Sequence, residues 1–304
     1  HDLDRTLVAA DTLVEALLHL LRRCPALALL LPWWLLRGRA HFKQQVARRA
    51  GLDAARLPYN PDVLALLQQE RRQGRTLVLA TAADRRIAEA VAAHLGFFSA
   101  VLASDGRVNL KGQAKADALV RRYGARGYVY VGDSRADLSV WRHAAGAVLV
   151  GGSPRLAARV EALVPDVRRL GAAPPSVAAA LLRLARPHQW AKNLLLLVPL
   201  VTAHRVGDAG AWIAAGEGIV AACLASSAVY AANDVADVDA DRAHPAKRTR
   251  PLASGLLQVR TALLFAAASA VLALLIGARL PVPFGVALLA YLAGTTAYTL
   301  WLKR

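Results

Sequence analysis

A cluster of carboxylates between two long apolar segments can carry out phosphate or metal chemistry. Residues 233–241 are Asn-Asp-Val-Ala-Asp-Val-Asp-Ala-Asp. On a helix, Asp234, Asp237 and Asp241 have i, i+3 and i+7 spacing and share one face, whereas Asp239 points away. Such carboxylates repel one another unless a divalent cation lies among them, and oxygen ligands without Cys or His partners favour Mg²⁺. We therefore predict a magnesium site on this face.

A basic segment follows these carboxylates directly and suits the phosphates of a substrate that shares the metal. Its cations are His244, Lys247, Arg248 and Arg250. The alternative is a charged, solvated loop whose cations fix the orientation of neighbouring membrane helices. We favour the binding site, because a loop does not require helical phasing of its carboxylates.

The same stretch fits a known pattern, N-D-x-x-D-x-x-x-D, followed by the basic tail and Pro-Leu-Ala-Ser-Gly at 251–255. It resembles the first aspartate-rich motif of the UbiA-type prenyltransferase superfamily. The resemblance implies that Mg²⁺ and a diphosphate bind here. The implied metal ligands are Asp234, Asp237 and Asp241, the implied phosphate ligands are Lys247, Arg248 and Arg250, and the implied substrate contact is Asn233.

A second polar group precedes the apolar segment from Leu194 to Ala203. Residues 186–193 are Arg-Pro-His-Gln-Trp-Ala-Lys-Asn. Polar groups entering a membrane helix are costly and indicate a site, although they can also anchor a helix at the lipid headgroups. R-P-x-Q-W-x-K-N resembles the branch of the superfamily that transfers phosphoribose to a polyprenyl phosphate. The resemblance implies that Arg186 and Lys192 bind phosphate and that Asn193 binds substrate.

Carboxylates also recur in the first half of the chain. Residues 2–6, Asp-Leu-Asp-Arg-Thr, place two aspartates where one can attack phosphorus and the other can protonate the leaving group. Thr81 ends an apolar run before a helix, which is a phosphate-binding arrangement and also an ordinary N-cap position. Asp133 and Asp137 follow another apolar run and suit Mg²⁺.

These groups resemble the four ordered motifs of the haloacid dehalogenase superfamily, including G-D-x-x-x-D at the last position. The resemblance implies a phosphatase with Asp2 as nucleophile, Asp4 as acid–base and Thr81 as a phosphate ligand. The implied metal ligands are Asp2, Asp4, Asp133 and Asp137. The motif lysine is Lys111, from its Lys-Gly context, with Lys115 as a rival that would bind phosphate. A doubly wound, Rossmann-like α/β domain with its site at the carboxyl ends of the strands is expected.

The apolar patterns predict the elements that position these residues. Residues 11–50 are expected to form a helical cap. We interpret its apolar run, 26–36, as cap core, although its tryptophans and the arginines that follow also suit a membrane interface. A helix at 60–73 and strands at 76–81, 128–131 and 148–151 are expected next.

Composition divides the chain of 304 residues, because charged residues are frequent to about residue 190 and rare afterwards outside the central motif. This predicts a soluble domain at 1–170, a linker at 171–180 and an all-α membrane domain at 181–304. The net charge of +17 suits an anionic membrane surface, and nothing indicates nucleic-acid binding. The expected membrane helices are 194–203, 209–232, 259–280 and 282–302.

The positive-inside rule predicts a multi-pass protein of a bacterial-type inner membrane, with the soluble domain in the cytoplasm. The UbiA pattern includes nine helices and a second aspartate motif. That second motif and the last five helices are absent from the sequence, and most of the strand that normally precedes the motif at residues 2–6 is also missing. The chain is therefore expected to be truncated at both ends and unable to catalyse transfer alone. The predicted function is Mg²⁺-dependent transfer of phosphoribose from a soluble diphosphate donor to a polyprenyl phosphate, with a phosphatase that acts on the product. The alternatives are prenyl transfer to an aromatic acceptor, a membrane-anchored phosphatase and a non-catalytic lipid-binding protein.

Overall fold

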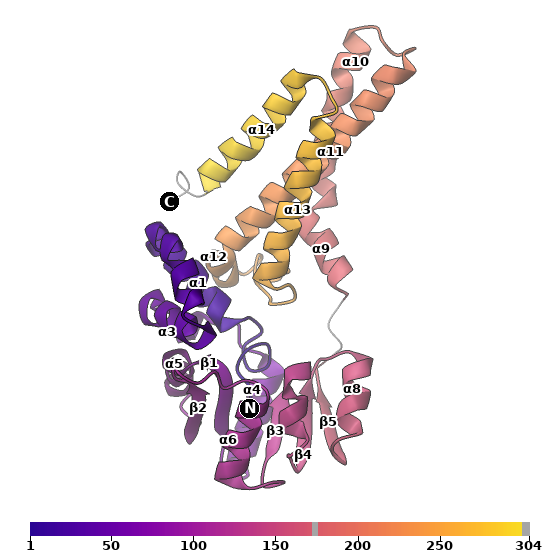
Figure 1. The fold of residues 1–304 in the computed structure, drawn as a ribbon. Coiled ribbons are helices and arrows are strands. Elements are labelled where there is room, and N and C mark those ends of the chain that lie inside the picture. The colour runs from indigo at the N-terminus through magenta and orange to yellow at the C-terminus, as the bar shows by residue number, and fades with distance from the viewer. Residues whose placement is uncertain (172–175, 300–304) are drawn as a thin grey trace. The chain divides into compact units, whose positions relative to one another are not determined.

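The computed structural model describes residues 1–171 and 176–299. The chain folds as two compact units, residues 1–174 and 175–304, the first α/β and the second helical (Figure 1). The predicted linker at 171–180 includes residues 172–175, which lie outside the described part. Each unit is described by itself below.

Unit 1 is built on parallel strands that alternate with helices, which confirms the predicted α/β fold. β1 pairs with β2, and β3, β4 and β5 form a second ladder in that order. The strands are β1 (Val78–Asp84), β2 (Ala100–Ser104), β3 (Val129–Gly132), β4 (Gly146–Val150) and β5 (Asp166–Leu170). The helices among them are α5 (Arg85–Leu95), α6 (Gln113–Tyr123), η3 (Arg135–Asp137), α7 (Leu138–Trp141) and α8 (Pro154–Glu161).

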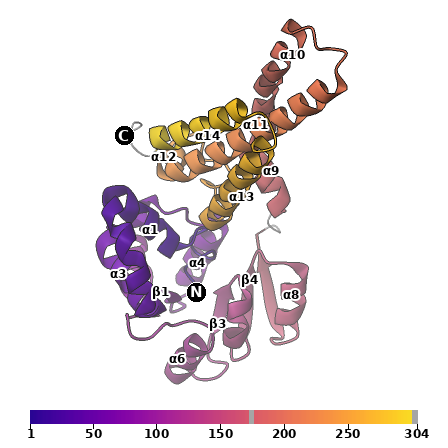
Figure 2. The same cartoon turned by 45° about the horizontal axis from the view of Figure 1, so that its top comes forward.

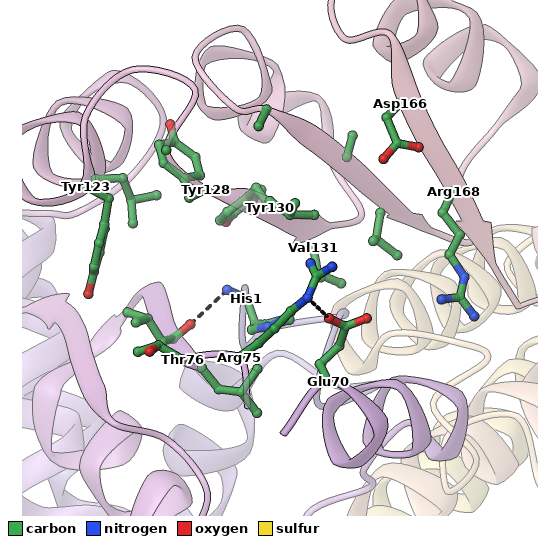
Figure 3. Close-up of a pocket in the computed structure, with 18 of the residues that line it drawn as sticks. His1, Glu70, Arg75, Thr76, Tyr123, Tyr128, Tyr130, Val131, Asp166 and Arg168 are labelled. Carbon is green, nitrogen blue, oxygen red and sulfur yellow. Dashed lines mark hydrogen bonds and ion pairs between the residues drawn. The ribbon is translucent and has the colours of Figure 1, made fainter. Parts of the chain in front are cut away.

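The first residues of the chain bridge the two ladders. Ala80 N on β1 donates to His1 O at 2.8 Å, and Asp2 N donates to Val131 O on β3 at 2.9 Å. Asp2 is thereby fixed between β1 and β3. Beside this bridge lies a cavity of about 590 Å³, whose lining includes the ion pair of Arg75 with Glu70 at 3.0 Å (Figure 3).

Six helical elements lie between Asp2 and β1; those up to Ala50 match the predicted cap at 11–50, and the last matches the separately predicted helix at 60–73. The six elements are α1 (Thr12–Arg23), η1 (Pro25–Leu30), α2 (Leu31–Leu36), α3 (Arg39–Ala50), η2 (Ala54–Arg56) and α4 (Pro61–Arg72). Asp11 begins α1 as an N-cap, because its carboxylate accepts from Leu13 N and Val14 N. Apolar side chains of α1, α3 and α4 share one buried core with β1.

The interpretation of the apolar run 26–36 as cap core is wrong. Within this run, which the structure describes in full, Trp34 is the one buried residue. Pro25 and Pro32 divide the run into the short elements η1 and α2, so it has no long helical face to bury. Most of its large side chains lie at the surface.

The described residues of unit 2 form helices joined by turns, and none of them lies in a strand (Figure 2). Its elements are α9 (Val177–Ala185), η4 (Pro187–Leu197), α10 (Val198–Thr202), α11 (Ala209–Ala236), α12 (Val238–Ala243), α13 (Val259–Gly277) and α14 (Val282–Ala297). Among these, α11 and α13 are long and apolar enough to cross a membrane. They pack against each other through small side chains, with Ala221, Ala225 and Ala273 fully buried.

The predicted count of four membrane helices is not confirmed. The segment 194–203 is divided between the 3₁₀ helix η4 and the five-residue helix α10, where Pro199 interrupts the pattern. Helix α14 has 16 residues in the described part of the chain, and the predicted end at 302 lies outside that part. α14 approaches α13 closely, since a Cβ on Gly277 would lie 2.9 Å from Leu288 Cδ2.

Candidate functional site

Three carboxylates converge where the first residues of unit 1 meet β3. Oxygens of Asp2, Asp133 and Asp137 all lie within 4.8 Å of one another. Asp133 directly follows β3, and Asp137 ends η3. Ser134 holds Asp137 in place, donating to its Oδ2 from Oγ at 2.8 Å and from the backbone N at 3.2 Å. This set of hard oxygen donors fits Mg²⁺.

Lys115 lies buried among these carboxylates. Its Nζ donates to Asp2 Oδ2 at 2.8 Å, to Tyr130 Oη at 2.7 Å and to Asp137 Oδ1 at 3.4 Å. Lys111, the first choice from sequence, is exposed and precedes helix α6. Of the two lysines considered from sequence, Lys115 is therefore the one that contacts the carboxylates.

Burial and charge oppose each other at this cluster. Burial raises the pKa of Asp2, although the Lys115 ammonium partly offsets this effect. Burial would lower the pKa of Lys115, but the carboxylates of Asp2 and Asp137 outweigh it and raise that pKa. Burial raises the pKa of Asp133 to about 7, against the nearby charge of Arg5. The lysine therefore remains a cation at neutral pH.

The carboxylate of Asp4 points elsewhere. It accepts from Thr12 N at 2.8 Å and from Thr12 Oγ1 at 2.7 Å, at the start of α1. The group of three aspartates within 4.8 Å of one another does not include it, so the expected fourth carboxylate ligand is not in place. Burial, and then the neighbouring charge of Asp11, raise the pKa of Asp4 to about 6. This pKa suits an acid–base residue.

Thr81 is fully buried within β1. Its Oγ1 accepts from Ala83 N at 3.1 Å, which leaves the hydroxyl proton available to a ligand oxygen. Two further residues at this site were not predicted from the sequence. Tyr130 Oη accepts a hydrogen bond from Lys115 Nζ and donates one to Asp137 Oδ1. Lys43 of α3 donates to Ala82 O at 2.6 Å, next to Thr81.

In unit 2 the two sequence motifs meet. Arg186 Nη2 donates to Asp234 Oδ1 at 2.6 Å. Arg250 Nη1 donates to Asp234 Oδ1 at 3.3 Å and to Asp241 Oδ2 at 2.7 Å. Both aspartates are buried. Two arginines thus neutralise two buried carboxylates, and the same cations can exchange to the phosphates of a ligand.

The predicted helical phasing is interrupted but not lost. α11 ends at Ala236 and α12 begins at Val238, with Asp237 between them at φ −100° and ψ 4°. Asp237 N still donates to Asn233 O and Asp241 N to Asp237 O, each at 2.8 Å. Helical spacing therefore carries Asp234 and Asp241 to the same arginine. Asp237 is half-buried, and Asp239 pairs instead with Arg242 at 3.5 Å.

Tyr230, one turn before Asp234, lies between two cations of the first motif. The Arg186 guanidinium lies 5.1 Å from the ring centroid and Lys192 Nζ lies 5.2 Å from it. Lys192 Nζ also donates to Tyr230 Oη at 2.7 Å. Tyr230 was missed from sequence, because a tyrosine in an apolar helix is ordinarily a packing residue.

The remaining predicted residues of unit 2 have other partners or are exposed. Trp190 Nε1 donates to Ser227 Oγ at 3.1 Å and Asn193 Nδ2 to Cys223 Sγ at 3.2 Å, which attaches η4 to α11. Asn233 accepts a hydrogen bond from the Thr299 hydroxyl. Lys247 and Arg248 are exposed.

Comparison with known families gives each unit a class. Residues 1–142 match the haloacid dehalogenase-like hydrolases, and residues 173–304 match the UbiA prenyltransferase family. The chain therefore contains a haloacid dehalogenase-like domain and a UbiA-family domain.

Individual relatives match either the whole chain or less than half of it. The uncharacterized protein y4nM of Sinorhizobium fredii is 38% identical over 306 residues, which cover all of this chain and 58% of that protein. Decaprenyl-phosphate phosphoribosyltransferase of Mycolicibacterium smegmatis is 37% identical over 137 residues, covering 43% of the chain and 42% of the enzyme. Its counterpart in Corynebacterium glutamicum is 40% identical over 117 residues, covering 38% and 35%. The chain spans about half the length of the curated relatives it matches.

Proposed function

We propose that unit 2 belongs to a membrane transferase that moves phosphoribose from a soluble diphosphate donor to a polyprenyl phosphate. The observation that carries this proposal is the network of Arg186, Arg250, Asp234 and Asp241, in which paired cations and carboxylates are gathered on one helix end. The two enzymes named decaprenyl-phosphate phosphoribosyltransferase support the choice of donor and acceptor.

The chain's residues suggest how the transfer proceeds. Asp234, Asp237 and Asp241 would hold Mg²⁺, which stabilises the negative charge of a departing diphosphate. Arg186 and Arg250 exchange their ion pairs with the carboxylates for ion pairs with the donor's phosphates. An oxygen of the lipid phosphate forms the new bond to C1 of ribose as the bond from C1 to diphosphate breaks. The product is a lipid-linked ribose that retains its 5-phosphate.

Unit 1 supplies a reaction that uses this product. We propose that Asp2 attacks the phosphorus of a phosphate monoester while Asp4 protonates the leaving oxygen. Asp4 then takes a proton from a water molecule whose oxygen bonds to phosphorus, the bond from phosphorus to Asp2 breaks, and inorganic phosphate is released. Thr81 and Lys115 hold the phosphate oxygens, and Asp2, Asp133 and Asp137 would hold Mg²⁺. Lys115 keeps these charges balanced because it remains protonated.

The transferase proposal is tested by donor binding to the 304-residue chain in lipid nanodiscs. With Mg²⁺ present, labelled phosphoribosyl diphosphate should bind more tightly than farnesyl diphosphate. Asp241→Asn removes a carboxylate that Arg250 contacts at 2.7 Å. Asp241 is also a proposed Mg²⁺ ligand, so the change removes a charge contact to the metal and diphosphate; such contacts are worth about 2–5 kcal/mol, and donor affinity should fall roughly 30-fold or more.

Asp239→Asn is the matched control on the same short helix, since Asp239 pairs with Arg242 instead. It should bind the donor within about threefold of wild type, as expected for a change of under 1 kcal/mol. Equal losses in the two variants would contradict the proposed site. Preference for farnesyl diphosphate would favour prenyl transfer instead.

The phosphatase proposal is tested by phosphate release from ribose 5-phosphate. Asp2→Asn should abolish release, because the amide is not a nucleophile. Asp117→Asn on α6 is the control, since Asp117 is exposed and bonds Gln113 at 2.8 Å. Full turnover by Asp2→Asn would overturn the assignment.

A further inference from the structure

The cap of unit 1 carries an exposed apolar ridge on η1 and α2. The ridge consists of Leu29, Leu30, Trp33, Leu35 and Leu36. The exposed fractions are 84% for Leu29 and 82% for Leu36, and 54% and 55% for Trp33 and Leu35. Single exposed apolar residues are ordinary, but a contiguous group of this kind marks a binding surface.

The ridge is held in place from the inner side. Trp34 is buried, and the Arg49 guanidinium of α3 lies 5.0 Å from its ring centroid. Leu27 and Leu31 pack against the core that α1, α3 and α4 share. The exposed side chains are thus presented by a segment that is fastened to the cap.

The surroundings of the ridge are strongly basic. The stretch 16–52 holds no aspartate or glutamate. Its lysine, Lys43, belongs to the site described above, and its six arginines are Arg22, Arg23, Arg37, Arg39, Arg48 and Arg49. The Arg37 guanidinium lies 4.8 Å from the centroid of the Trp33 ring, and both residues are exposed. Apolar side chains, a tryptophan and flanking arginines are the combination that binds the interface of an anionic bilayer.

We propose that the apolar ridge inserts into the headgroup region of an anionic lipid bilayer. Basic residues near such a surface are attracted to its anionic headgroups. The same chain includes α11 and α13, which are long and apolar enough to cross a membrane. A tether of this kind keeps unit 1 close to lipid, so a weak surface contact is sufficient. The proposal does not depend on the reaction of either unit.

Depth-sensitive fluorescence tests the contact in the full 304-residue chain. Cys24 and Cys223 are replaced by serine, and Leu36→Cys is labelled with an environment-sensitive dye. The chain is reconstituted in vesicles of equal parts phosphatidylcholine and phosphatidylglycerol, with or without a nitroxide lipid. The control label is at Ala158→Cys, an exposed position on α8 of the same unit.

The label at position 36 should shift to shorter wavelength and be quenched by the nitroxide lipid, whereas the label at 158 should do neither. In vesicles of phosphatidylcholine alone, quenching at position 36 should fall, because the attraction of the arginines is lost. Equal quenching at 36 and 158 would overturn the proposal. A shielded label at 36 that lipid nitroxides do not quench would show that protein covers the ridge, which also overturns it.

A second pair of variants separates insertion from folding. Trp33→Ser with Leu36→Ser changes exposed side chains, so the unfolding temperature of the chain should be unchanged. A label at Leu29→Cys in that background should lose most of its quenching by lipid nitroxides. Retained quenching in a chain of unchanged unfolding temperature would count against the ridge.

Discussion

Arg186 and Asp234 lie 48 positions apart in sequence, yet the guanidinium donates to the carboxylate at 2.6 Å. Arg186 adopts a left-handed φ of 53°, which costs a non-glycine residue about 1–2 kcal/mol. This backbone conformation is therefore held by contacts of the side chain with Asp234 and with the Tyr230 ring. The two motifs of unit 2 are thus in direct side-chain contact.

Arg186→Gln should weaken donor binding to the chain in nanodiscs. The change removes a charge that lies against buried Asp234, so a loss of about 2–5 kcal/mol, roughly 30-fold or more in affinity, is expected. Arg183→Gln is the control, because Arg183 is exposed on the preceding helix α9. Similar losses for the two variants would indicate a general effect of positive charge.

Tyr230 should act by positioning Arg186 and Lys192. Tyr230→Phe keeps the ring between the two cations but removes the oxygen that Lys192 contacts at 2.7 Å. Tyr230→Leu removes the ring as well, and cation–π contacts contribute about 0.5–2 kcal/mol each. Donor affinity should therefore fall modestly for the phenylalanine variant and about tenfold or more for leucine. Wild-type affinity in Tyr230→Leu would refute this role.

Lys115→Met should both destabilise unit 1 and stop phosphate release. It leaves Asp2 and Asp137 without their shared buried cation, and breaking a buried pair costs about 3–5 kcal/mol. Lys111→Met is the matched control, since Lys111 is exposed and such changes cost under about 0.5 kcal/mol. Denaturant unfolding and ribose 5-phosphate turnover measure the two effects. A larger loss of turnover in Lys111→Met would restore the assignment made from sequence.

Alkaline pH should destabilise unit 1 through two tyrosines. Burial raises the pKa of Tyr59 and of Tyr128 to about 12, against about 10 in an unfolded chain. A raised tyrosine pKa means that the folded state favours the neutral side chain. Each tyrosine's contribution to folding stability is therefore complete below a pH of about 10 and is lost as the pH rises through about 12. Tyrosinate absorbance should therefore include delayed ionisations of Tyr59 and Tyr128, beside that of Tyr130, whose pKa burial also raises. Tyr128→Phe should remove one of them, and an unchanged titration would contradict the assignment.

Much of unit 1 was predictable because its buried strands are short apolar runs that end in polar groups. β1, β3 and β4 were expected close to their observed positions. β2 was not predicted, and neither was β5, whose sequence Asp-Val-Arg-Arg-Leu places charged side chains on an exposed edge strand. An edge strand has no two-sided burial, so its sequence lacks the pattern on which the prediction relied.

The site residues were predictable by type but not by geometry. Spacing indicated that Asp234 and Asp241 share a face, and both contact Arg250. Spacing could not place Asp4 against Thr12 or choose Lys115 over Lys111, because both depend on where a helix begins. The exposure of the apolar ridge could not be predicted from the sequence either, because an apolar segment at a membrane surface has the same composition as one in a protein core.

The two proposed reactions make a specific prediction about their shared intermediate. Transfer of phosphoribose leaves a lipid-linked ribose 5-phosphate at the membrane, where unit 1 is tethered. A tethered site meets such a product at an effective concentration on the order of millimolar. Removing its phosphate would make the transfer effectively irreversible.

The chain should therefore release inorganic phosphate from lipid-linked ribose 5-phosphate supplied in vesicles, at a higher rate than from free ribose 5-phosphate at equal bulk concentration. Water is consumed, the ester bond breaks, and a lipid-linked ribose remains. Asp2→Asn should leave the phosphorylated lipid intact, whereas Asp241→Asn should not slow its hydrolysis, because that change affects the transferase site alone. Mass spectrometry of the extracted lipid measures both. Identical products from wild type and Asp2→Asn would rule out the relay, and loss of hydrolysis in Asp241→Asn would show that the two sites are not independent.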